Sequence, residues 1–178
     1  MNALPFSEAG GVASAAAKSP LRLRKILVPL DFSDCSLKAL KYALALARQF
    51  GGELTLLHVV EAAFYATDPS LAAPMYPEEE MRLFAEKKLA MLARSALGDQ
   101  VPAALLVRLG QPVVEISALA REANIDLIVI STHGNTGLKH FLLGSVAENV
   151  VRHAPCPVLV VREHEHEFLA DAPEAIAK

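Results

Sequence analysis

ISTHGNTGLKHFLLGSV, residues 130–146, is the stretch that decides the fold of this chain. It follows an apolar run of strand character and contains three glycines, two serines, two threonines and two histidines. A helix is expected to open at Gly144 and Ser145, where unpaired N–H groups and the helix dipole favour negative charge. Backbone N–H groups approach an anion only where side chains are small. The stretch therefore predicts a site for a phosphorylated small molecule, and a nucleotide is the first hypothesis.

Short apolar runs and helical periods alternate along the rest of the chain. Strands are expected at residues 25–31, 53–60, 101–109, 126–131 and 157–161, with helical spacing of apolar residues between them. This order predicts an α/β fold, a single open five-stranded parallel sheet of Rossmann-like type with helices on both faces. If the strand order is 3-2-1-4-5, ligands bind beyond the carboxyl ends of the first and fourth strands, where the order reverses.

The bulk composition limits the function classes. The chain has 178 residues, 53% of them hydrophobic and 21% charged, which is typical of one soluble domain. A net charge of -3 predicts no nucleic-acid partner, and no apolar run is long enough to predict a membrane span. Cys35 and Cys156 are far apart in the sequence and are expected to be small buried or half-buried hydrophobes. The cytoplasm is the expected location.

The two ends of the chain differ in composition from its middle. Residues 1–22 are rich in Ala, Gly, Ser and Pro, and a flexible extension is expected there. Residues 23–162 are expected to form the folded domain and residues 163–178 a tail. His164 and His166 in the tail could bind a metal, but a solvated tail is the preferred interpretation.

Some of the polar residues at the predicted strand ends have more than one possible role. Asp31 could accept a hydrogen bond from a ribose hydroxyl or an exocyclic amine, or it could cap its own turn or the first helix. His133 could polarise a phosphate or take a proton, or it could donate to a backbone carbonyl. Gly134 and Gly137 permit close approach of a ligand, or they are turn glycines only. His58 is expected to be a satisfied core or rim histidine.

Hydroxyl groups favour the ligand interpretation of residues 130–146. Thr132, Thr136 and Ser145 could donate to phosphate, and Ser145 is also expected to cap its helix. Lys139 and His140 could meet phosphate oxygens or be solvated. The stretch matches neither a Walker A loop nor a G-x-G-x-x-G motif. No Ser-His-Asp set, paired metal ligands or evident general base stands in the sequence, which argues against dedicated catalysis but leaves slow metal-assisted ATP hydrolysis open.

Three segments together resemble the universal stress protein family: ILVPLDFSDCSLKAL (26–40), LLHVV (56–60) and STHGNTGLKHFLLGSVAENVVRHAPCPVLVV (131–161). The resemblance covers roughly residues 24–162. ATP-binding members of that family carry Gly-x2-Gly-x9-Gly-Ser/Thr. Here Ser131, Gly134, Gly144 and Ser145 stand at these positions with the same spacing, and Ser131 replaces the first glycine.

The resemblance implies a role for each matched position. Adenine and ribose would lie along strand ends, and the phosphates would meet N–H and hydroxyl groups of the later segment. The implied nucleoside residues are Pro29, Asp31, Val59, Ile130 and Ser131, and the implied phosphate residues are Gly134, Gly144, Ser145 and Val146. The implied ligand is ATP, or ADP or AMP, with Mg²⁺ held through the phosphates. The resemblance also implies a homodimer through the terminal strand PVLVV at residues 157–161 and an unidentified protein partner.

Three function classes follow. The first is a nucleotide-dependent stress-response regulator or adaptor with at most slow ATP hydrolysis. The alternative is a nucleotide-free dimeric scaffold of the same fold, which Ser131 supports and Gly134, Gly144 and Ser145 oppose. The third is an adenylyl-transferring or flavin-binding enzyme of related architecture. The segment PLDFSD contains neither the His-x-Gly-His turn nor the Ser-Gly-Gly loop expected of a nucleotidyl transferase.

Overall fold

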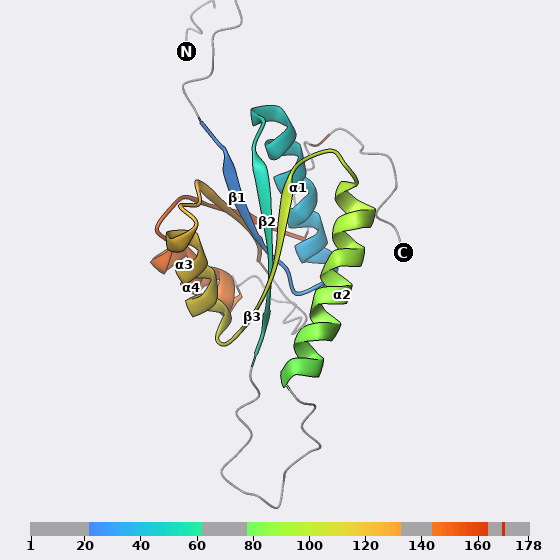
Figure 1. The fold of residues 1–178 in the computed structure, drawn as a ribbon. Helices are drawn as coiled ribbons and strands as arrows, with labels where there is room; N and C mark the ends of the chain where they lie inside the picture. The colour runs from blue at the N-terminus through green and yellow to red at the C-terminus, as the bar shows by residue number, and fades with distance from the viewer. Residues whose placement is uncertain (1–21, 62–77, 133–143, 164–168, 170–178) are drawn as a thin grey trace, which may run out of the picture.

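The computed structural model describes residues 22–61, 78–132, 144–163 and 169 (Figure 1). Strands and helices alternate through these segments, as the sequence predicts. The elements are β1 (Lys25–Pro29), α1 (Asp34–Phe50), β2 (Glu53–Val60), α2 (Glu78–Leu97), β3 (Ala103–Leu109), α3 (Pro112–Glu122), β4 (Leu127–Ser131), α4 (Ser145–His153) and β5 (Val158–Val161).

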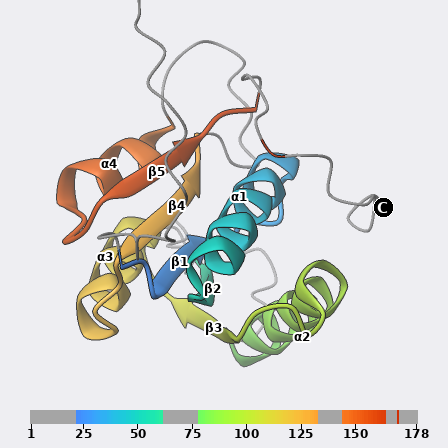
Figure 2. The ribbon, with the colours of Figure 1, turned by 90° about the horizontal axis from the view of Figure 1, so that it is seen from above.

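The strands form one parallel sheet in the order β3-β2-β1-β4-β5. Helices α1 and α2 cover one face of the sheet, and α3 and α4 cover the other, as the view from above shows (Figure 2). The predicted fold class and strand order are therefore confirmed. The order reverses between β1 and β4, so the polar residues that follow these two strands lie next to each other at one edge of the sheet.

The central strand β1 is apolar at its three middle positions because it is covered on both faces. Ile26 and Val28 pack into the core beneath α1 and α2, whereas Leu27 packs into the core beneath α3 and α4. All three side chains are fully buried. A strand covered on both faces needs apolar residues in both alternating rows, so its sequence shows no polar alternation.

The first strand ends two residues earlier than the sequence predicts. The prediction extended it to Asp31, but β1 ends at Pro29. Phe32 then turns the chain with a φ of 66°, which is unusual for a residue other than glycine. Ser33 caps α1, because its side chain accepts a hydrogen bond from the backbone N–H of Ser36 at 3.2 Å.

Most of the two ends of the chain lie outside the described residues. The expected extension, up to residue 21, and all of the tail except residues 163 and 169 are in these parts, so their expected roles stay predictions. Among the helices that the structure does describe, none combines the length and the apolar character needed to cross a membrane.

Candidate functional site

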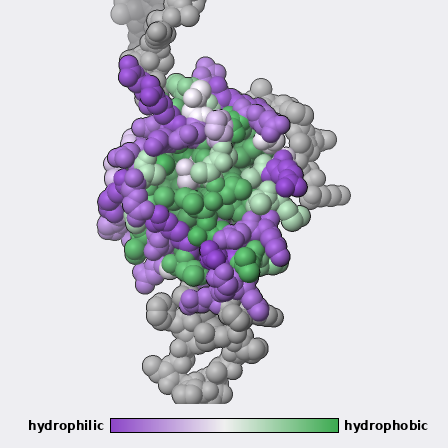
Figure 3. Space-filling model, in the orientation of Figure 1, coloured by the Kyte–Doolittle hydropathy of each residue, from purple (hydrophilic) through white to green (hydrophobic). Residues whose placement is uncertain are grey.

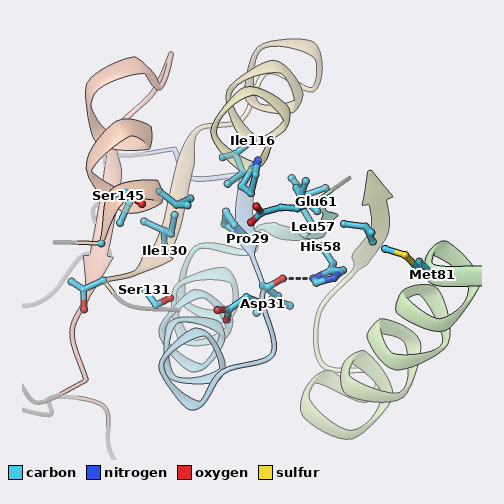
Figure 4. A pocket seen from close by; sticks show the side chains of 18 residues that line it. Pro29, Asp31, Leu57, His58, Glu61, Met81, Ile116, Ile130, Ser131 and Ser145 are labelled. Carbon is cyan, nitrogen blue, oxygen red and sulfur yellow. Dashed lines mark hydrogen bonds between the residues drawn. The ribbon is translucent and has the colours of Figure 1, made fainter. Parts of the chain in front are cut away.

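A cavity of about 460 Å³ opens at the carboxyl ends of β1, β2 and β4 (Figure 4). Ligand sites commonly have volumes of roughly 300–1,000 Å³. The cavity lies where the strand order reverses, as predicted. It brings together eight of the nucleotide contacts that the resemblance implies, from four separate segments: Pro29, Asp31, Val59, Ile130, Ser131, Gly144, Ser145 and Val146.

One end of the cavity is formed by the N-terminus of α4. Gly144 is the N-cap residue of this helix, and as a glycine it has no side chain that could cap the helix. The Gly144 N–H donates to the carbonyl of Thr132 at 2.8 Å, and the Thr132 N–H donates to the carbonyl of Val161 at 2.9 Å. These bonds tie the start of α4 to the ends of β4 and β5. The first backbone N–H groups of α4 therefore begin at the cavity wall, with no cap from the side chain of the N-cap residue.

The position of Ser145 corrects one prediction. The sequence predicts a capping hydroxyl at Ser145, but Gly144 occupies the cap and Ser145 is the first residue of the helix. A side chain caps from the N-cap position, where its oxygen reaches the N–H groups two and three residues later. The Ser145 hydroxyl does not have that geometry. Ser145 does line the cavity, so its predicted contact with phosphate remains a prediction.

Asp31 stands at the opposite, nucleoside side of the predicted site. Its Oδ1 accepts hydrogen bonds from the backbone N–H of Ser33 at 3.0 Å and from the Ser33 hydroxyl at 2.6 Å. The turn-capping role left open for Asp31 is thus present in the structure. Asp31 also lines the cavity. Its predicted contact with a ligand stays a prediction, and the bonds from Ser33 would hold the carboxylate in place for that contact.

His58 borders the same side and is held in one orientation. Its Nδ1 lies 2.7 Å from the carbonyl oxygen of Leu30, and a carbonyl only accepts, so Nδ1 carries the hydrogen. The ring of Phe32 lies 4.5 Å from the His58 ring between centroids, and Lys88 Nζ lies 4.2 Å above the Phe32 ring. The expectation of a satisfied rim histidine is confirmed. The stack joins the β1–α1 turn, β2 and α2.

The cavity contains residues that the sequence did not single out for the site. Helices α2 and α3 contribute Met81, Pro112 and Ile116, and Glu61 follows β2. Figure 4 shows Glu61 directed over Pro29 into the cavity. The apolar members form a slot suited to a planar base, since ligand pockets are lined mainly by hydrophobic side chains. In the sequence, the one signal for Glu61 as a site residue is its place directly after a predicted strand.

Charge is unevenly distributed in the cavity. Among the described lining residues, the ionisable side chains are Asp31, His58 and Glu61, and none of them comes from β4 or α4. Lysine and arginine are absent from that described lining. Within the same described part of the chain, no three His, Cys, Asp or Glu side chains are grouped as metal ligands. Among the described residues, the groups that could meet an anion at α4 are therefore backbone N–H and hydroxyl groups.

Two predicted site residues, His133 and Gly134, lie outside the described residues. The same is true of Thr136, Gly137, Lys139 and His140, and their predicted roles stay predictions.

Comparison with known proteins agrees with this geometry. The model of the universal stress protein family matches residues 22–162. The chain belongs to the universal stress protein family. Universal stress protein MJ0531 of Methanocaldococcus jannaschii is 38% identical over 149 residues, covering 81% of this chain and 85% of the relative. The structure of the universal stress protein UspA from Lactobacillus plantarum matches with a TM-score of 0.65 at 31% identity, covering 80% of this chain and 99% of that one.

Two further universal stress protein structures contain nucleotides. One, 24% identical with a TM-score of 0.58, is a complex with cAMP and covers 81% of this chain and 100% of its own. The other, from Archaeoglobus fulgidus, is 19% identical with a TM-score of 0.53, is a complex with dAMP and covers 79% of this chain and 99% of its own. At these identities the likeness establishes the shared fold.

Proposed function

We propose that this universal stress protein binds an adenine nucleotide, ATP or its products ADP and AMP, in the cavity between β1 and β4. The observation that carries the proposal is the N-terminus of α4, whose N-cap glycine supplies no capping side chain and which opens onto a cavity with an apolar slot. Exposed helix N–H groups favour phosphate, and the slot suits a base. The cAMP and dAMP complexes of the two family members support the same ligand class.

The residues present fit the parts of such a ligand. Gly144, Ser145 and Val146 would receive the phosphates, and Asp31 would lie near the ribose or base. Ile130, Ser131, Pro29 and the backbone of Val59 would complete the nucleoside contacts, with His133 and Gly134 as further proposed contacts. Because no basic side chain stands in the described lining, Mg²⁺ held by the phosphates would offset much of their charge.

We infer a regulatory or adaptor role in the stress response, with at most slow ATP hydrolysis. The described residues at the α4 end are apolar, glycine or hydroxyl residues, so they supply no general base beside the phosphates. A homodimer through the β5 edge and an unidentified protein partner are part of the proposal. The cytoplasm is the proposed location, in keeping with Cys35 and Cys156 as free thiols.

The test has two steps. The purified protein is denatured, and released small molecules are identified by mass spectrometry. Calorimetric titration with ATP, ADP, AMP and adenosine follows, each with and without Mg²⁺. Bound adenine nucleotide, or saturable binding that Mg²⁺ strengthens for ATP, is expected. A protein that carries no nucleotide and binds none of the four would overturn the proposal in favour of the nucleotide-free scaffold that Ser131 suggests.

A further inference from the structure

The outer edge of β3 is apolar and exposed. β3 is an edge strand that pairs only with β2. Residues 103–106 are four successive exposed residues, all of them Ala or Leu. Leu105, Leu106 and Leu109 are 39%, 37% and 37% exposed. Figure 3 looks onto this edge and shows a central apolar surface surrounded by hydrophilic residues. Apolar surface with a polar rim is typical of a protein-binding site.

The backbone of this edge presents a continuous row of hydrogen-bonding groups. The Leu54 N–H donates to the Pro102 carbonyl at 2.9 Å, and the Gly110 N–H donates to the Val60 carbonyl at 3.0 Å. Along a strand, successive residues direct their N–H and C=O groups to opposite sides, so the even-numbered residues bond to β2. The odd-numbered residues direct their N–H and C=O groups away from the sheet: Ala103, Leu105, Val107 and Leu109.

The usual protection of an edge strand is weak here. Natural edges carry lysine, proline or a bulge to prevent pairing with another chain. The one charged residue in β3 is Arg108, and its guanidinium pairs with Glu122 at 2.5 Å and with Glu115 at 3.4 Å, both on α3. The arginine is therefore held against α3 and does not cover the outer backbone groups of the strand.

We propose that the β3 edge binds the β3 edge of a second copy of this chain, as an antiparallel pair about a two-fold axis at Leu106. In this register Leu105 lies opposite Val107 of the second copy, and Ala103 lies opposite Leu109. All four outward residues then exchange hydrogen bonds, which gives about eight across the interface. The interface is isologous, because each copy contributes the same patch.

Charge favours this occupant and this register. With Leu106 on the axis, each Arg108 lies opposite Ala104 of the other copy, so apolar residues face one another along the centre and no like charges meet. A register centred on Arg108 would oppose two arginines. The pairing is separate from the proposed β5 dimer, because β3 and β5 lie at opposite edges of the sheet (Figure 2). It does not depend on nucleotide binding.

The first test measures assembly of the full chain by analytical ultracentrifugation over a wide concentration range. Leu106→Lys puts two lysines opposite each other on the axis and is expected to weaken one association step by roughly tenfold or more. Met91→Lys is the matched control, since Met91 is a 73% exposed residue of α2 away from the strand edge, and it should associate like wild type. A wild type that stays monomeric, or a Leu106→Lys variant in which every association step of wild type keeps its strength, overturns the proposal.

The second test reads the register by oxidative crosslinking in a Cys156→Ser background, where Cys35 remains buried. Leu106→Cys should form an intermolecular disulfide readily, because residues opposite each other on adjacent strands have Cβ atoms about 5 Å apart. Ala103→Cys should not, since position 103 faces position 109 of the second copy. Equal crosslinking of both variants would refute the two-fold at Leu106, as would crosslinking of neither while the association step persists.

Discussion

Replacing Gly144 by aspartate tests the α4 end of the cavity, because helix stability and anion binding should change in opposite directions. Gly144 has φ -58° and ψ 147°, which residues other than glycine adopt without strain. Aspartate is a preferred N-cap residue, and its charge interacts favourably with the helix dipole. Gly144→Asp is therefore expected to raise the free energy of unfolding by about 0.5–1 kcal/mol, measured by urea denaturation.

The same carboxylate would occupy the N–H groups proposed to hold phosphate. Two like charges about 5 Å apart in a medium of effective dielectric about 20 repel by roughly 3 kcal/mol, which is about a hundredfold in dissociation constant. Calorimetry with Mg-ATP should show this loss of affinity. Adenosine has no phosphate, so its affinity for the variant should be almost the same as for wild type. Gly144→Asn is the matched control, because it supplies a similar cap without the charge and should weaken ATP less.

Two results would refute the reasoning. Unchanged Mg-ATP affinity in a stably folded Gly144→Asp variant would mean that phosphate does not lie at α4. Equal losses for ATP and adenosine would mean that the new side chain closes the cavity rather than repelling phosphate. The first result would require the proposed place of the phosphates to be abandoned, and the second would refute the predicted charge repulsion.

Three further predictions address other parts of the molecule. Asp31→Asn keeps an oxygen that can accept from Ser33, so stability should change by less than about 0.5 kcal/mol while calorimetry shows ATP and adenosine weakened alike; a loss confined to ATP would contradict the nucleoside placement. Phe32→Gly and Phe32→Ala both lose the ring, but only glycine relieves a φ of 66°, so in denaturation the glycine variant should be the more stable by about 1 kcal/mol. Burial and the Asp126 carboxylate raise the pKa of the Cys156 thiol. Its alkylation near neutral pH, followed by mass spectrometry, should therefore be slower than that of a free thiol, and the rate should rise only at higher pH. A rate equal to that of free cysteine would contradict the raised pKa.

The arrangement of strands was predictable because burial on both faces gives β1 and β4 short uninterrupted apolar runs, at residues 26–28 and 127–130. The run at 126–131 is observed as β4 (Leu127–Ser131), and the order 3-2-1-4-5 places it beside β1. The ends of strands were less predictable. β1 stops at Pro29 because the turn that follows is set by the Asp31–Ser33 hydrogen bonds and the φ of Phe32, and these have no periodic signal.

The residues of the candidate site can likewise be divided into those that the sequence could indicate and those that it could not. Residues at strand ends could be singled out, because parallel strands bring their carboxyl ends to one edge. Met81, Pro112 and Ile116 reach the cavity only through the packing of α2 and α3 on the sheet, and no local pattern in the sequence indicates that packing. The cap of α4 was misplaced by one residue at Ser145, since glycine and serine are both acceptable caps and only the observed backbone distinguishes them.

The structure shows that the backbone does not require a glycine at position 131, where the family motif has one. It ends β4 at a regular strand position opposite Val161, and it is not one of the described residues with positive φ. The backbone therefore has no need of glycine at this position, and a glycine there would serve only to leave room for a ligand. If the site had been lost through Ser131, wild type would bind no nucleotide and Gly144→Asp would change stability alone. The paired stability and binding measurements at Gly144 thus separate a working site from a scaffold without altering Ser131.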